Sequence, residues 1–501
     1  MDGTKPTRRH RPWLAAAVSS LALCACALQP AYQAPQAGDV TQATGWHAAL
    51  PHGGKVEDLV DWWGRFDDPA VAELIRMAET GSPTLAKAVA RISGARATLA
   101  SSNADAWPSL TGSGSVTRAK SSMALGNATI TSLTTTRSIG QDASWEIDLF
   151  GKVRSARESS QAQLDARIDD WHDARVSLAA ELADTYVQYR ACRQLARAYE
   201  QSATSYAQTE NATQAAVGAG MSAASDGYLA AASTASARAA ATQQNVACEE
   251  LVKSLVALTG ANEPTLRNII DRSGAPDMPE PAAFRVESVP ADLVRQRPDL
   301  VSSERALAAA YADIGQARAN RFPSLSLSGS MTVSATNLSA PLSGWSFGPS
   351  LSVPLFDAGK RSAAVDSAQA SYDAQLAAYR SAVLTAIKEV EVALVDLDGA
   401  ARRSDDARRA AEQYGRYEHA TEINWRAGFD TLLTLEQARR SLTSAEITTI
   451  ELQRDRVRSW IALYKALGGG WQVTSASPSS SHAAVALATP HALVFSQGTT
   501  P

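Results

Sequence analysis

This 501-residue chain has four cysteines, the residues in it best suited to covalent chemistry. Two of them are spaced so that they could form a disulfide. Cys192 and Cys248 lie at equal distances from Gly220, inside a turn sequence (VGAGMSAASDG) between two helix-forming segments. Residues equidistant from the turn of an antiparallel helical hairpin lie at the same height, and thiols that meet in an oxidising compartment form disulfides. We therefore expect a Cys192–Cys248 disulfide, and the alternative is a pair of small buried thiols.

The other two cysteines end an apolar run at the N-terminus. Basic residues precede the short run that starts at Trp13, which is the pattern of an export signal. The run ends in LCAC, which resembles a bacterial lipobox whose last residue is Cys26. From this pattern we expect residues 1–25, including Cys24, to be removed and Cys26 to be acylated. Two or more acyl chains on Cys26 would anchor the protein stably in a membrane. Plain secretory cleavage nearby is the alternative.

The rest of the composition excludes several classes of function. The chain has 47 Lys and Arg against 51 Asp and Glu, a formal net charge of −4, so nucleic acid is not an expected partner. No run approaches about 18 apolar residues, which excludes a protein built from membrane-spanning helices. Seven scattered His residues have no metal-ligand spacing, and no catalytic set or nucleotide-binding loop is found. We expect no enzyme, no metal site and no cofactor besides the lipid on Cys26.

The elements that must position these residues occur twice, at an offset of about 210 residues. Four landmarks recur in the same order: WPSL from Trp107 as FPSL from Phe322, SWEIDLFGKVRSA from Ser144 as SLSVPLFDAGKRSA from Ser350, Ala219-Gly220 as Ala427-Gly428, and ALTG from Ala257 as ALGG from Ala466.

Each half is expected to contain one very long helix and one returning helix. The first long segment contains no Pro or Gly and is rich in good helix formers. Its length as a helix would be on the order of 100 Å, so it must form a coiled coil or a barrel stave. Leu164, Trp171 and Leu178 repeat every seven residues, which is typical of a left-handed supercoil. The expected helices are 152–217 and 223–258, then 360–427 and 431–467.

Between the helices lie segments that alternate apolar and small polar residues, as membrane β-strands do. The alternation is clear in a hairpin at about 323–355 and weaker in one at about 108–150. A half-buried hairpin of a soluble domain is the alternative. Two hairpins supply four strands, too few to close a barrel, and open sheet edges do not persist in hydrocarbon. If the strands enter a membrane, three chains would supply twelve of them.

Ordered motifs run through residues 20–471: PAYQAP from Pro30, WWGRFDDP from Trp62, WEIDLFGK from Trp145, VPADLVRQRPDL from Val289, and LYKALGGGW from Leu463. With these motifs the chain resembles the TolC-like outer-membrane factors, and within them the NodT-type lipoproteins. The resemblance implies a mainly α fold with a membrane β-barrel part. Long antiparallel helices of a homotrimer would form an α-barrel in the periplasm, below a twelve-stranded barrel in the cell outer membrane. It also implies docking onto a periplasmic adaptor and an inner-membrane pump, commonly of the resistance-nodulation-division class.

The duplication and the resemblance together predict the organisation of the chain. The expected parts are a signal peptide at 1–25, a first repeat at 26–261, a proline-rich linker at 262–297, a second repeat at 298–471 and a disordered tail at 472–501.

The turns between long and returning helices are expected at the periplasmic tip, where members of the resembled family close their channel. Leu433 matches the family's constricting leucine, whereas Gln437 stands where an aspartate is usual and Glu436 lies beside it. The gate candidates are Leu433, Glu436, Gln437, Asp430 and Asp226.

A plainer interpretation of Asp430 is favoured over a gating role. Its position suggests the N-cap of the returning helix, a role that Ser222 would repeat in the first half. Asp226 is either an acidic contributor to the gate or a partner of the helix dipole.

The resemblance predicts a passive outer-membrane exit duct of a tripartite efflux system for drugs or other small toxic solutes. An export duct for proteins or metal ions is the first alternative. A lumen rich in Met or His would favour metal ions, and the chain has only six Met. A periplasmic coiled-coil structural lipoprotein without a pore is the second, and it leaves the amphipathic hairpins unexplained.

Overall fold

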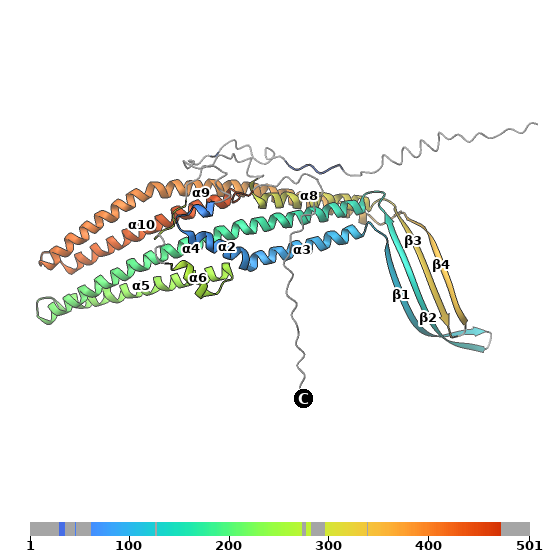
Figure 1. Cartoon of the computed structure of the whole chain (residues 1–501), viewed down its shortest axis with the longest axis horizontal. Coiled ribbons are helices and arrows are strands. Elements are labelled where there is room, and N and C mark those ends of the chain that lie inside the picture. The colour runs from blue at the N-terminus through green and yellow to red at the C-terminus, as the bar shows by residue number, and fades with distance from the viewer. Residues whose placement is uncertain are drawn as a thin grey trace, which may run out of the picture.

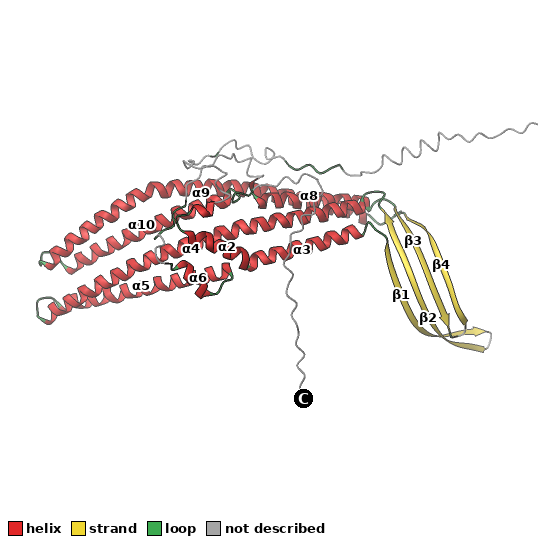
Figure 2. Cartoon of the chain, in the orientation of Figure 1, coloured by secondary structure: helices red, strands yellow, loops and turns green. Residues whose placement is uncertain are grey.

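The chain is elongated and divides into a helical part and a sheet. Long helices lie side by side, and the sheet projects beyond one end of them (Figure 1). Figure 2 shows that the described strands all lie at that end. The expected signal peptide, Cys26 and the tail after Trp471 lie outside the described residues. This computed structural model describes residues 30–35, 46, 62–125, 128–272, 277–281, 296–337 and 339–471.

Two long helices of equal length, α4 (Lys152–Gly218) and α9 (Lys360–Arg426), run through the helical part. Each has 67 residues, which corresponds to about 100 Å. Each begins directly after a glycine with positive φ, 80° at Gly151 and 88° at Gly359, a conformation that costs glycine little. Both helices agree with their expected ranges to within one residue.

The returning helices are α5 (Ala224–Thr259) and α10 (Leu432–Ala466). The chain reverses before each of them at a glycine with positive φ, 73° at Gly220 and 80° at Gly428. Only glycine adopts this conformation without a steric cost from Cβ. The two turns lie side by side at the end of the molecule that is remote from the sheet (Figure 1, left).

Shorter helices complete the helical part. The helix α3 packs along α4, and α8 packs against both α4 and α9 on the side of the sheet. The order of a helix, two strands, a long helix and a returning helix therefore occurs twice. None of the described helices combines the length and the apolar character needed to cross a membrane. The shorter elements are η3 (Trp62–Arg65), α2 (Pro69–Gly81), α3 (Pro83–Ala104), α6 (Glu263–Ile270) and α8 (Pro298–Ala319).

The four strands form one antiparallel sheet in the order β1-β2-β3-β4. Strands β2 and β3 pair from Ile147 opposite Leu325 to Thr136 opposite Thr336, which joins the hairpins of the two halves. The weakly signalled first strand is 17 residues long, longer than either strand of the clearer hairpin. The strands are β1 (Ser109–Leu125), β2 (Ala128–Ile147), β3 (Ser324–Thr336) and β4 (Ser339–Ser352).

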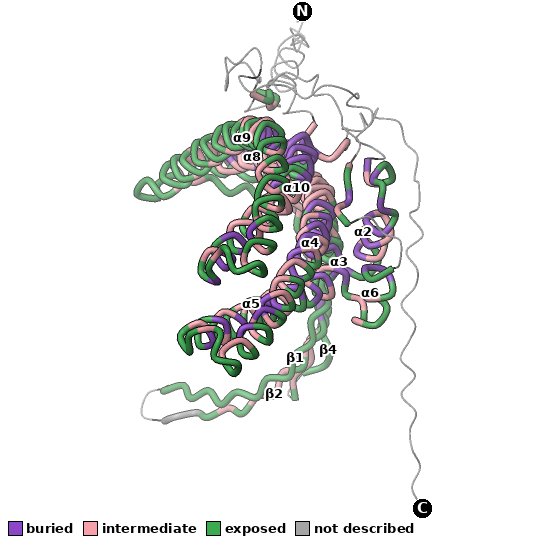
Figure 3. Tube along the Cα trace, turned by 90° about the vertical axis from the view of Figure 1, so that its left-hand side faces the viewer, coloured by how far each residue is buried: buried purple, intermediate pink, exposed green. Residues whose placement is uncertain are grey.

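The largest hydrophobic core lies midway along the long helices, where η3, α2 and α6 cover them. Trp62 is fully buried, and its ring stacks on Tyr464 with the centroids 4.8 Å apart. The hydroxyl of buried Tyr186 on α4 donates to Asp68 Oδ2 at 2.6 Å, which satisfies a buried polar pair. Figure 3 shows the buried residues concentrated along α4 and α2 and the strands largely exposed.

Candidate functional site

The sheet has one apolar face and one face lined with hydroxyl groups. Residues that stand opposite one another in the register share a face. Gln141, Met331 and Trp345 stand side by side across three strands on the apolar face. On the hydroxyl face, Ser115 stands opposite Ser138, and their hydroxyl oxygens are 2.8 Å apart. The alternation expected from the sequence is thus continued across the strands.

The apolar face is exposed over most of the sheet and half-buried next to the helices, at Trp145, Ile147 and Leu325. The side chain of Trp345 is 81% exposed and that of Ile139 is 72% exposed. A contiguous exposed apolar face indicates a non-aqueous neighbour, and its alternation with a polar face is typical of a membrane β-strand. The exposed apolar residues of this face include Leu110, Val116, Ile139, Met331, Val333, Trp345, Phe347 and Leu351.

At the opposite end, a cleft of about 760 Å³ separates the two hairpin turns, and we call it the tip cleft. Asp226 lines it from the first hairpin, and Asp430 and Leu433 line it from the second. Leu433 is 51% exposed. Three of the five gate candidates therefore meet around one opening, whereas Gln437 is exposed elsewhere on α10 and Glu436 is buried.

The expected helix caps are wrong by one position in both hairpins. Thr431, not Asp430, is the N-cap of α10, and its Oγ1 accepts a hydrogen bond from the backbone N–H of Thr434 at 3.2 Å. Ala223, not Ser222, precedes α5. In both hairpins the expected cap, Asp430 or Ser222, still belongs to the turn. The residue after it, Thr431 or Ala223, has the extended backbone of an N-cap.

Glu436 does not present a carboxylate at the tip. Its side chain is 1% exposed, and Arg439 Nη1 lies 3.9 Å from Oε1. Neither carboxylate oxygen has a well-aligned hydrogen-bond partner among the described residues, although the Tyr206 and Ser233 side chains lie near it. Burial raises the pKa of the Glu436 carboxyl, and Arg439 opposes this rise. The expectation of an exposed charge is wrong because helical periodicity places Glu436, like Leu432, on the buried side of α10.

Sequence reasoning missed Arg439, which joins the two hairpins beside the tip cleft. Its guanidinium donates to Thr209 Oγ1 and, at 3.3 Å, to Glu418 Oε1. Nη2 lies 3.8 Å from Glu422 Oε1, and the guanidinium carbon lies 5.9 Å from the centre of the Tyr206 ring. The two glutamates belong to α9 and the other two partners to α4. These partners are distant from Arg439 in sequence. The one nearby feature that could have pointed to Arg439 is Glu436, an acidic residue three positions earlier on the same helix.

The first hairpin is crossed by a disulfide between Cys192 on α4 and Cys248 on α5. Their Cα atoms are 5.5 Å apart, and both side chains are buried beside Ala196. The side-chain amide of Gln244 lies 3.1 Å from the Cys192 sulfur. The equal distance of the two cysteines from the turn therefore places them at the same height of an antiparallel helix pair.

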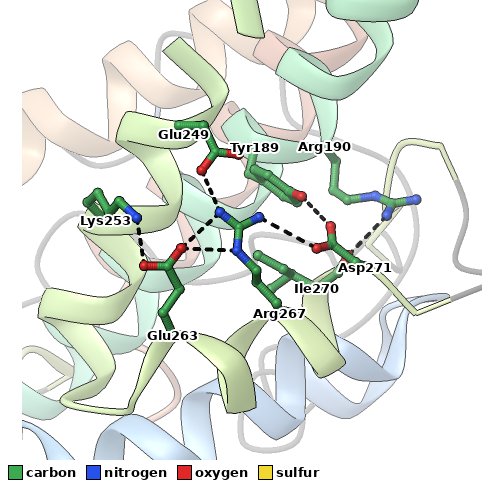
Figure 4. A network of polar contacts seen from close by, with 8 residues as sticks. All are labelled: Tyr189, Arg190, Glu249, Lys253, Glu263, Arg267, Ile270 and Asp271. Atoms are coloured by element: carbon green, nitrogen blue, oxygen red, sulfur yellow. Dashed lines mark hydrogen bonds and ion pairs between the residues drawn. The ribbon is translucent and has the colours of Figure 1, made fainter. Parts of the chain in front are cut away.

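A polar network next to the disulfide fastens α6 to the same hairpin (Figure 4). Arg267 of α6 binds Glu249 of α5 and, at 2.9 Å, Glu263. The hydroxyl of Tyr189 on α4 donates to Asp271 at the end of α6. Exposed ion pairs are individually weak, but a network of them fixes the orientation of a short helix.

The structure places no metal centre among the residues that it describes, since no group of three or more His, Cys, Asp or Glu is arranged to hold an ion there.

Comparison with known proteins gives matches along most of the chain. A family model described as outer membrane efflux protein matches residues 74–261 and 289–469. Each matched segment includes two strands, a long helix and its returning helix. The chain is 31% identical to the toluene efflux pump outer membrane protein TtgC of Pseudomonas putida, covering 91% of this chain and 95% of the relative. It is 30% identical, with the same coverage, to the antibiotic efflux pump outer membrane protein ArpC of Pseudomonas putida.

The architecture also matches a solved structure closely. The outer-membrane channel OprN superposes with a TM-score of 0.77 and 31% sequence identity, covering 89% of this chain and 99% of that one.

Proposed function

Because the chain belongs to the outer membrane efflux protein family, we propose that it is the passive exit duct of a tripartite pump for small toxic organic solutes. It is an outer-membrane efflux component that works with an adaptor and an inner-membrane pump, and its helices lie in the periplasm. The observation that best supports a duct is the sheet, whose apolar face suits lipid and whose hydroxyl face suits an aqueous lumen.

The duct is a homotrimer. Strands β1 and β4 are the edges of the sheet, and their unpaired backbone groups are too costly to leave in hydrocarbon. Pairing β1 of one copy with β4 of the next satisfies both edges. Three copies with four strands each give twelve strands, which is an even number within the known range of outer-membrane barrels.

The duct accepts solutes of several chemical classes, and the partner pump selects among them. The names of two relatives specify toluene and antibiotics. The hydroxyl face of this sheet consists mainly of Ser and Thr, which offer hydrogen bonds to many solutes. Its acidic residues are Asp142 and Glu146, and Glu146 is ion-paired with Lys152. Such a surface lets hydrated organic molecules pass and does not bind one of them tightly.

The chain performs no chemistry, holds no cofactor and takes its transport energy from the pump. An acylated Cys26 anchors it in the inner leaflet of the outer membrane. The adaptor docks at the hairpin turns, where Phe429 is 84% exposed and Met221 is 77% exposed. Large apolar side chains at an exposed tip suit contact with a partner protein.

Conductance of the full-length protein in planar bilayers tests this proposal. We expect a small current from the wild type and a larger one from a variant that combines Leu433→Ala with Arg439→Leu, because both changes widen the tip cleft. Absence of current from both proteins would favour a structural lipoprotein without a pore.

Drug accumulation in cells that lack their own outer-membrane component gives a second test. The chain is expressed with its adaptor and pump, and accumulation of a fluorescent dye and of an antibiotic is measured. We expect both to fall relative to cells without the chain, and unchanged accumulation in a strain that contains all three parts would contradict the proposal.

A further inference from the structure

Three basic side chains follow the apolar residues on the apolar face of the sheet. Arg118 and Lys120 belong to β1, and Arg137 belongs to β2. The register pairs Val116 with Arg137 and Thr135 with Arg118, so the three cations occupy neighbouring positions of one face. All three are exposed. We call them the basic rim.

The basic rim starts where the apolar band ends. On β2 the band runs from Ile147, next to the helices, to Ile139, and Arg137 is the next residue on that face. The ten residue steps from Ile147 to Arg137 cover about 33 Å along the strand, which is about 25 Å of height at the tilt of about 40° that such strands adopt. The apolar band of an outer-membrane barrel is about 25 Å tall. The basic rim therefore lies at the membrane boundary that is remote from the periplasmic helices.

The strands contain no charge that could neutralise the basic rim. Strands β1, β3 and β4 have no Asp or Glu. On β2, Asp142 stands opposite Thr111 and Glu146 opposite Ser326, so both lie on the hydroxyl face. The same strands of a neighbouring copy would add no acid to the apolar face either. Like charges at adjacent positions of one sheet face repel each other, so a counter-anion from outside the strands would stabilise them.

We propose that Arg118, Lys120 and Arg137 bind the phosphate groups of phosphorylated glycolipid in the outer leaflet of the membrane. This rests on the proposed function only in that the sheet must lie in the outer membrane, with its apolar face toward lipid and the helices in the periplasm. Acyl chains then contact the apolar band, and headgroup phosphates reach the cations directly beyond it. Guanidinium groups bind phosphate through paired hydrogen bonds, and basic residues at a membrane surface attract anionic lipid.

Lipid binding to the full-length protein tests the basic rim. The protein in neutral detergent is titrated with diphosphorylated lipid A, with the same lipid after enzymatic dephosphorylation, and with inorganic phosphate, and bound lipid is counted by native mass spectrometry. The variant Arg118→Gln, Lys120→Gln, Arg137→Gln should bind diphosphorylated lipid A roughly tenfold or more weakly at low salt. Binding of the dephosphorylated lipid should not change.

A matched control removes the same charges from an exposed helix face: Lys87→Gln, Arg91→Gln and Arg96→Gln on α3. We expect this control to bind the lipid as the wild type does. The variant Arg118→Lys, Arg137→Lys keeps the charge and should retain most of the affinity for lipid A. If the triple variant does not fold, Lys120→Gln alone serves as the test and should bind lipid A several-fold more weakly.

Equal lipid binding by the wild type and the neutralised variants would overturn the proposal, as would an equal loss in the α3 control. Inorganic phosphate that binds as tightly as the lipid would indicate a free-anion site instead. Conductance tests the duct separately: a basic-rim variant that conducts but loses lipid contradicts neither proposal, whereas a wild type without current that still binds lipid contradicts only the duct.

Discussion

The two hairpins of the helical part are fastened in different ways. The first, α4 with α5, is crossed by the Cys192–Cys248 disulfide. The second, α9 with α10, contains no cysteine. Its buried Arg439 forms ion pairs with Glu418 and Glu422 of α9 and donates a hydrogen bond to Thr209 of α4. A covalent bond holds one arrangement, whereas polar contacts can be exchanged one at a time. The disulfide lies 28 residues from Gly220 on each helix, about 40 Å from the turn, so it holds the body of the first hairpin. We therefore predict that the second hairpin, which has only polar contacts, shifts at the tip more readily.

The largest expected effect comes from removing the covalent link. Replacing Cys192 and Cys248 together with Ser should lower the free energy of unfolding by about 4 kcal/mol, the chain-entropy estimate for their separation of 56 residues. Thermal unfolding followed by circular dichroism without reductant measures the change. Wild-type protein with reductant should melt like the double variant, and reductant should not affect the variant. Equal melting of variant and oxidised wild type would show that the disulfide does not fasten this hairpin.

Removing the polar link should have the next largest effect. Arg439→Leu leaves Glu436 buried without its nearest cation, which should cost about 3 kcal/mol. Because Arg439 also joins the hairpins beside the tip cleft, single-channel conductance in planar bilayers should rise. The control is Arg440→Leu, which removes an exposed charge from the adjacent position. If both variants conduct equally, the second hairpin is not held by Arg439.

Much of the fold could be predicted because it is encoded in local periodicity. The long helices follow from unbroken runs of helix formers, and Leu164 and Leu178 of the heptad pattern are buried as a packed seam requires. The strands follow from the alternation of apolar and polar residues, which is clear in the second hairpin and weaker in the first. The same reasoning located the turns, because glycines interrupt otherwise continuous helices.

The tip could be predicted only in part because its contacts are long-range. The family resemblance predicts Leu433 at the tip, the position of Asp226 just after the first turn predicts the same for it, and both line the tip cleft. The burial of Glu436 depends on which side of α10 meets α4, and a one-residue shift of the helix start changes that side. Arg439 could not be recognised, since its partner Thr209 lies 230 positions away.

A smaller effect is expected from the titration of Glu436. Burial raises its pKa, so the folded chain keeps this proton at pH values where the unfolded chain has lost it. The wild type is therefore most stable below the ordinary carboxyl pKa, where both the folded and the unfolded chain carry this proton. Its free energy of unfolding falls as pH rises through the raised pKa. Glu436→Gln should be more stable than the wild type at neutral pH, with a free energy of unfolding higher by on the order of 1 kcal/mol. The difference should shrink as the solution is acidified.

Urea unfolding of both proteins between neutral and mildly acidic pH measures this difference. The titratable and charged neighbours Tyr206, Glu418, Glu422, Arg439 and Arg440 are present in both proteins, so the comparison isolates Glu436. A variant that is less stable than the wild type at neutral pH would show that the ionised carboxylate stabilises the contact between α10 and α4.

The smallest effect on stability and the most selective effect on the channel are expected at Leu433. Its side chain is 51% exposed in the tip cleft, so Leu433→Ala should change the free energy of unfolding by less than about 1 kcal/mol. The truncation nevertheless removes apolar bulk between the hairpin turns, and conductance should rise without any change in salt dependence, because no charge is altered. Leu229→Ala, on the first-hairpin side of the same cleft, is the matched control. If the second hairpin is the part that shifts, Leu433→Ala should raise conductance more than Leu229→Ala does. Equal responses would mean that the two hairpins contribute alike at the tip, despite their different fastening.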